Sequence, residues 1–147
     1  MDRPTPSAEA PHRVGPEAGW RESWTFEMVS ATASLLVRMT LMAEGPAWFW
    51  AYLLRPDHGV LSVRDHEVPR PRLPGLEIRA EALWAEMFCE QPLDHWSVGL
   101  EAFGVLLDHP ADALAGERGE RTGLGVDLGW EAAGEASPVP GGYQGPA

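Results

Sequence analysis

Apolar side chains recur at every second residue through most of the chain, in short runs separated by Gly, Pro and Asp. For example, Trp24, Phe26 and Met28 occupy alternate positions in residues 23–30. A period of two places these side chains on one face of a β-strand, whereas a helix needs a period of 3.6. Runs of this kind are typical of antiparallel sandwiches and barrels. Only residues 110–117, which begin with a proline, predict a short helix.

The pattern predicts a chain of strands with two polar or proline-rich ends. Strands are expected over residues 23–30, 35–42, 47–54, 60–65, 96–108 and 122–131, with one long run or two short strands over 76–90. Residues 1–19 hold four prolines and few apolar side chains, so they predict a flexible N-terminal arm. Residues 132–147 predict a flexible C-terminal tail. The β-domain is therefore expected over residues 20–131, a size suited to one modest core.

Two of these runs are apolar on both faces. In residues 47–54, one face holds Trp48, Trp50 and Tyr52, while the other holds Phe49 and further apolar residues. A sheet with one face in water shows a polar face instead. The pattern favours a small antiparallel, lipocalin-like β-barrel whose outer surface is covered by a helix, an arm or a second subunit. A homodimer is the expected assembly.

Composition excludes several functions. The chain has 22 acidic and 11 basic residues, a formal charge of −11, and every basic residue is an arginine. The missing lysine rules out Schiff-base chemistry and a P-loop lysine. The acidic balance argues against a nucleic-acid or membrane surface, since both need clustered positive charge. With one cysteine, Cys89, and no signal-like segment, a cytoplasmic location is expected.

Aromatic residues are the first candidates for a site. Seven tryptophans can fill a core, or they can line a wide pocket for a bulky apolar ligand. In the pocket interpretation a lone arginine among apolar neighbours, and a histidine beside a mixed polar face, add polar contacts. The substrate-binding candidates are Trp48, Trp50, Trp84, Trp96, Arg38 and His95.

Charged residues inside the predicted strands are the catalytic candidates, together with Tyr52. Glu86 falls in phase with apolar residues, so burial would raise its pKa and make it a general acid, unless it lies at a strand rim or is paired. Glu101 lies on a mixed face and is either a cavity residue or solvent-facing. Arg79 lies in phase with Glu77, which favours a cross-strand ion pair; in a cavity it would instead clamp a carboxylate or enolate oxygen.

No metal or cofactor is predicted. The five histidines lack HxH and HExxH spacing, and there is no GxSxG or phosphate-binding glycine loop. Cys89 is most simply a small buried hydrophobe.

One stretch carries a family resemblance. Residues 76–107, LEIRAEALWAEMFCEQPLDHWSVGLEAFGVLL, followed by GERTGLGVDLGWE, resemble a poorly characterised actinobacterial family of lipocalin-like barrels distantly similar to hydroxyneurosporene synthase. The resemblance covers residues 20–131. In size, fold class and aromatic content the chain also resembles small β-barrel polyketide cyclases, including [4+2] cyclases. This second resemblance is one of fold alone.

These observations predict a cofactor-free cyclase or isomerase of secondary metabolism that folds a bulky apolar polyketide or terpenoid inside an aromatic-lined barrel. Glu86 or Glu101, with Arg79 or Tyr52, would then move a proton or polarise a carbonyl. A lipocalin-like carrier of a hydrophobic small molecule is the alternative from another class. A hydratase or dehydratase is the third.

Overall fold

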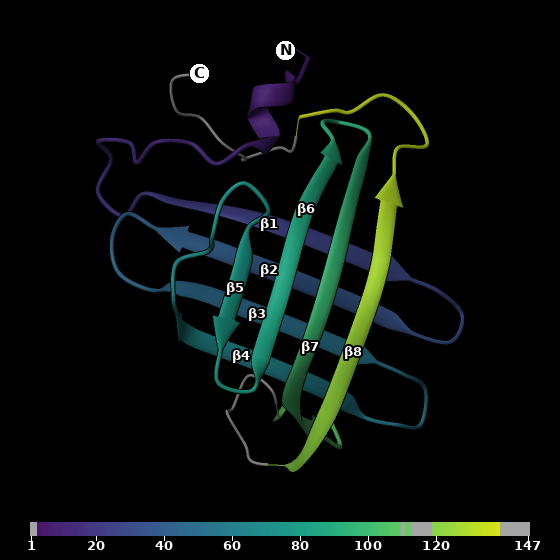
Figure 1. Cartoon of the computed structure of the whole chain (residues 1–147). Coiled ribbons are helices and arrows are strands. Elements are labelled where there is room, and N and C mark those ends of the chain that lie inside the picture. Colours follow the sequence, from purple (N-terminus) through teal and green to yellow (C-terminus); the bar gives the residue numbers. More distant parts are fainter. Residues whose placement is uncertain (1–2, 110, 113–118, 139–147) are drawn as a thin grey trace.

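The computed structural model describes residues 3–109, 111–112 and 119–138 (Figure 1). Within these residues the structure has one short 3-10 helix and eight strands. They are η1 Pro6–Glu9, β1 Arg21–Val29, β2 Ser34–Met42, β3 Ala47–Leu54, β4 Val60–Val68, β5 Glu77–Ala80, β6 Leu83–Gln91, β7 His95–Leu107 and β8 Glu120–Glu131. Most of the predicted helix over residues 110–117, and part of the predicted tail, lie outside the described residues.

The strands form two antiparallel layers that cross each other (Figure 1). The strand order is β1-β2-β3-β4-β7-β6-β5, and β8 pairs with β7. The layers β1–β4 and β5–β8 are joined where β4 pairs with the end of β7, from Val60↔Leu107 to Ser62↔Val105. The predicted all-β antiparallel fold is confirmed. As far as the described residues go, no pairing joins β1 to β8, so the barrel is open rather than closed.

The core fills the space between the two layers. Phe49, Met39 and Val37 project from the first layer, and Val98 and Leu100 from the second, each 0 % exposed. Their alternate neighbours along each strand point outward, as a period of two requires. The interior that the sequence predicted as a hollow for a large guest is therefore occupied by packed apolar side chains.

At the open edge of the sheet, aromatic side chains rather than backbone hydrogen bonds connect β1 to the second layer. The indole N–H of Trp130 in β8 donates to the carbonyl of Glu27 in β1 at 2.9 Å. Phe26 lies between two tryptophans, 5.3 Å from Trp130 and 5.5 Å from Trp96 between ring centroids. Three of the aromatic residues thus hold β1 against the second layer.

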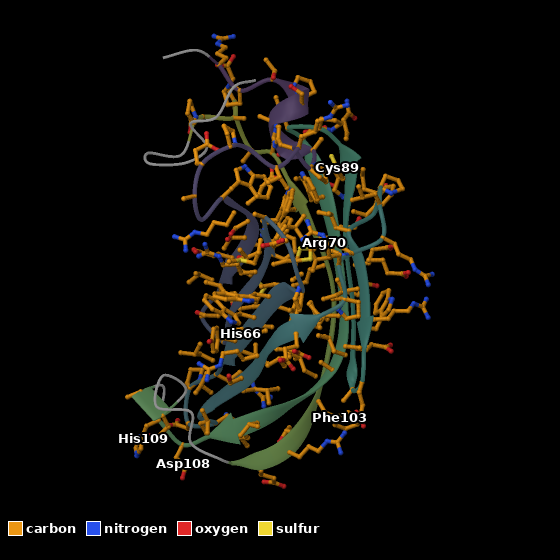
Figure 2. All side chains as sticks on the ribbon, turned by 90° about the vertical axis from the view of Figure 1, so that its left-hand side faces the viewer. His66, Arg70, Cys89, Phe103, Asp108 and His109 are labelled. Carbon is orange, nitrogen blue, oxygen red and sulfur yellow. The ribbon has the colours of Figure 1, made fainter. Side chains whose placement is uncertain are left out.

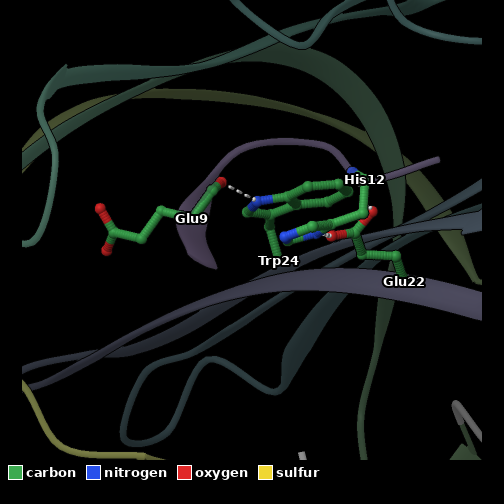
Figure 3. Close-up of polar contacts among 4 residues, drawn as sticks. All are labelled: Glu9, His12, Glu22 and Trp24. Carbon is green, nitrogen blue, oxygen red and sulfur yellow. Dashed lines mark hydrogen bonds and ion pairs between the residues drawn. The ribbon is translucent and has the colours of Figure 1, made fainter. Parts of the chain in front are cut away.

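The N-terminal segment lies across one end of the sandwich (Figures 1 and 3). The indole N–H of Trp24 donates to the carbonyl of Glu9 at 2.9 Å, and the Glu9 carboxylate accepts from the N–H of Leu93 in the β6–β7 turn at 2.5 Å. His12 contacts the Glu22 carboxylate through both its backbone N–H and its ring. The composition of this segment did not predict these contacts; the domain boundaries stay a prediction.

Residues 76–90 form two strands rather than one. A tight turn separates β5 from β6, and Ala82 in it has a φ of 59°. Because this turn changes the phase, Glu86 pairs in register with Glu77 and not with a residue of the inward face, where Ile78 lies. The expectation that Glu86 has no polar neighbour in phase is corrected on this point.

Candidate functional site

The predicted site residues lie in three places rather than around one hollow. Four lie on the outer face of β1–β4, five lie on the outer face of β5–β8, and Trp96 lies in the core at 8 % exposure. The first group is Arg38, Trp48, Trp50 and Tyr52. The second group is Arg79, Trp84, Glu86, His95 and Glu101.

Trp84 and Glu101 lie in an open groove of about 430 Å³ on the outer face of the second layer. Its lining is Ala80, Ala82, Leu83, Trp84, Glu101, Ala102, Phe103, Gly123 and Leu124. We call this hollow the Trp84 groove. Phe103, at 56 % exposure, is one of the large exposed apolar side chains of the described chain (Figure 2). Among the residues that the structure describes, Glu101 is the only charged one in the lining.

Glycines on β7 and β8 leave room for the aromatic rings on this face, and Gly123 also lines the groove. A Cβ on Gly99 would lie 2.9 Å from the Trp84 ring, so one edge of the indole covers the β7 backbone at this glycine. A Cβ on Gly123 would lie 3.6 Å from the Phe103 ring, and Gly125 has nothing within 4 Å of such an atom. Beside the two aromatic rings, β8 therefore has glycine at residues 123 and 125, while Arg121 of the same strand lies over the Phe103 ring, 4.5 Å from its centroid. The alternation of glycine at residues 123, 125 and 129 was the available sequence signal.

Hydrogen bonds hold the Trp84 indole in place from the side of β5. Its N–H donates to Glu77 Oε2 at 3.2 Å, and Arg79 donates to both oxygens of the same carboxylate at 3.3 and 3.4 Å. The hydrogen bonds from Arg79, and then from Trp84, lower the pKa of Glu77. Arg79 thus forms an ion pair within its own strand, whereas the sequence favoured a cross-strand pair or a clamp for a ligand oxygen.

The two predicted acids differ in their surroundings. Glu101 is exposed and lies in register between Trp84 and Gly125. Glu86 is half-buried on the same outer face, and its carboxylate packs over the backbone of Gly75, where a Cβ would lie 3.0 Å from Oε2. Only Glu101 borders the groove, so it is the acid that a molecule bound there would meet.

His95 lies at the far end of this face. A Cβ on Gly129 would lie 3.3 Å from its Nε2, so the imidazole covers the β8 backbone away from the groove. The adjacent Trp96 points inward and packs on Phe26.

The outer face of β1–β4 carries a second group of residues, which we call the Trp50 cluster: Arg38, Trp48, Trp50 and His66. His66 stacks on Trp48 with 4.5 Å between ring centroids and 19° between planes. Its Nε2 accepts a hydrogen bond from the Trp50 indole N–H at 2.7 Å, and the Arg38 guanidinium lies 5.9 Å from the Trp50 ring. His66 was not predicted as a site residue, because a bulge between β3 and β4 sets its position beside Trp48. Tyr52 lies further along β3, against Val60.

A second open hollow, of about 800 Å³, lies among loops. It lies beside the β1–β2 and β3–β4 turns and the end of β7. Its charged and titratable lining residues are Arg55, Asp57, His58 and Asp108. His58 Nδ1 contacts the Pro56 carbonyl at 2.6 Å. None of the ten predicted site residues borders this hollow.

In residues 3–109, 111–112 and 119–138, no group of three or more His, Cys, Asp or Glu side chains is placed to hold a metal ion. The described part of the chain also contains no helix long and apolar enough to cross a bilayer.

Fold and surface together define an open, two-layered antiparallel β-domain with a filled core and aromatic residues on both outer faces. The chain belongs to the DUF7064 family, described as a domain of unknown function, whose profile matches residues 5–145. This agrees with the expectation of a poorly characterised family. No curated protein and no solved structure matches the chain.

Proposed function

We propose that this domain binds an apolar small molecule bearing a hydroxyl or amine, and that the Trp84 groove is its site. The observation that carries the proposal is the groove itself, which brings Trp84, Phe103 and Glu101 together. Its volume of about 430 Å³ lies within the usual range for small-molecule sites. Because the interior is filled, a carrier of this kind would hold its ligand on the sheet surface.

The lining determines the ligand class. Ala80, Ala82 and the two aromatic rings offer apolar contact, while the Glu101 carboxylate accepts hydrogen bonds. A ligand with a donor group would satisfy that carboxylate, whereas a ligand carboxylate would be repelled by it. A matched pair of alcohol and acid therefore tests the assignment.

The test is a titration of the full chain with 1-octanol and with octanoate, followed through the indole N–H signals in NMR. We expect octanol to shift the Trp84 signal and octanoate to bind at least fivefold more weakly. Trp84→Ala should weaken octanol binding tenfold or more, while Val29→Ala, a change of an exposed apolar residue on β1, should leave it unchanged. Equal octanol affinity of the wild type and Trp84→Ala would contradict the proposal that the Trp84 groove is the binding site.

A second candidate is the cyclase or isomerase expected from the sequence, for which hydroxyneurosporene synthase and polyketide cyclases are the resemblances. The supporting observation is that Glu101 borders an apolar groove, where a carboxylate can accept a proton and return it to the same substrate. Glu101→Gln would then lose turnover of a cyclising substrate by a larger factor than it loses octanol affinity, because an amide oxygen still accepts a hydrogen bond but does not take up the proton. Unchanged turnover in Glu101→Gln would exclude this role.

A further inference from the structure

Arg38 forms no ion pair with a carboxylate in the part of the chain that the structure describes. Its Nη2 donates to Ser23 Oγ at 3.3 Å, and its Nε is buried without a hydrogen-bond partner. The ion pairs found among the described residues involve other side chains. Leaving a half-buried arginine uncompensated is costly, and this chain has 22 acidic residues from which a partner could have come. The arrangement therefore points to an anion from outside.

Rigid aromatic rings lie directly beside this charge. Arg38 in β2 pairs in register with Trp50 in β3. The hydrogen bond from Trp50 to His66 fixes the plane of the indole, and His66 is held in turn by stacking on Trp48. Such a platform binds flat rings at little entropic cost because its side chains are already ordered.

Charge and platform together select one kind of ligand. An inorganic anion would use the arginine alone, and a neutral aromatic molecule would use the rings but leave the guanidinium unpaired. A planar aromatic carboxylate uses both, with its oxygens accepting from the guanidinium and its ring on the indole. We propose that the Trp50 cluster is a binding site for an aromatic carboxylate.

This site is independent of the Trp84 groove. His66 lies on the first layer and Phe103 on the second, and Figure 2 shows them on opposite sides of the molecule. Ligands of opposite chemistry can therefore bind the two faces: hydrogen-bond donors beside Glu101, and anions beside Arg38. Either site can fail its test without affecting the other.

The experiment compares 2-naphthoate with 2-naphthalenemethanol and with acetate on the full chain, again through the indole N–H signals. We expect naphthoate to shift the signal of Trp50, with the alcohol and acetate each binding at least tenfold more weakly. Arg38→Gln should lose tenfold or more of naphthoate affinity. Arg3→Gln, which removes an exposed arginine paired only with Glu135, should lose none.

Thermal unfolding gives a second measurement in case binding is weak. Naphthoate should raise the Tm of the wild type and of Arg3→Gln but not that of Arg38→Gln. If Arg38→Gln does not fold, Arg38→Lys replaces it: it keeps the charge but loses the two-pronged donor, so its affinity should fall severalfold. Equal binding of naphthoate and the alcohol, or naphthoate shifts confined to Trp84, would overturn the proposal.

Discussion

Replacing Gly99 by alanine should destabilise the protein although the residue lies on an outer face. The new Cβ would lie 2.9 Å from Cη2 and 3.0 Å from Cζ3 of Trp84, closer than real contacts allow. The indole must therefore leave the β7 backbone. Doing so also breaks its hydrogen bond to Glu77.

Opposing terms give the expected magnitude. Displacing a packed side chain costs about 1–3 kcal/mol, and the lost hydrogen bond costs about 0.5–1.5 kcal/mol. Replacing glycine in a strand interior returns about 0.5–1 kcal/mol, because the unfolded chain loses freedom. Together these terms predict a fall of about 0.5–4 kcal/mol in the free energy of unfolding, with the lower half of this range expected because the indole is half-exposed.

Gly125→Ala is the matched control. Gly125 occupies an outward position on the neighbouring strand β8, and nothing lies within 4 Å of its would-be Cβ. It keeps the entropic gain without the clash, so its stability should stay level or rise by up to about 1 kcal/mol. Urea unfolding of both variants measures the difference directly.

The double variant identifies the cause. In a Trp84→Ala background there is no indole to displace, so the further change Gly99→Ala should cost nothing. If Gly99→Ala and Gly125→Ala have equal stability, or if the cost of Gly99→Ala persists without Trp84, then the indole does not lie where we describe it.

Two further predictions concern titrating groups. Hydrogen bonds lower the folded-state pKa of Glu77 below its ordinary value of 4.5, so this carboxylate stabilises the fold above pH 4.5. That contribution is lost as the pH falls through the lowered pKa. In urea unfolding, the stability of Glu77→Gln should therefore decline less below pH 4.5 than that of the wild type. Burial, and then the nearby Glu9 carboxylate, raise the pKa of the Cys89 thiol. Because the thiolate is the reactive form, Glu9→Gln should speed the alkylation of Cys89 by iodoacetamide at pH 8. An unchanged rate would argue against the contact between Glu9 and Cys89.

The alternation of apolar residues was sufficient to predict most strands. The predicted strand over residues 47–54 coincides with β3, and the one over 35–42 falls one residue short of β2. Turns at Gly45 and Gly59, both with positive φ, mark the ends of these runs. Local sequence carries this information because strand period and turn chemistry are local properties.

The inward face of β3 could not be predicted in the same way. Phe49 and its neighbours are apolar, and so is the stripe that contains Trp48 and Trp50, so hydrophobicity does not distinguish the two faces. Which face turns inward depends on the second layer crossing behind it, and that crossing is set by the pairing of β4 with the end of β7. Long-range pairing leaves no local signal in a single sequence.

The filled core explains why both candidate sites lie outside the sheet layers. A chain of this length has one modest core, and Phe49 and Met39 occupy the space that a closed barrel would leave for a guest. Aromatic residues beyond those needed for packing can then act only at the surface, where glycines or a paired histidine hold them in place. On that reasoning, Phe49→Ala should destabilise the fold by about 3–5 kcal/mol in urea unfolding, while the binding of ligands to the two outer faces stays unchanged.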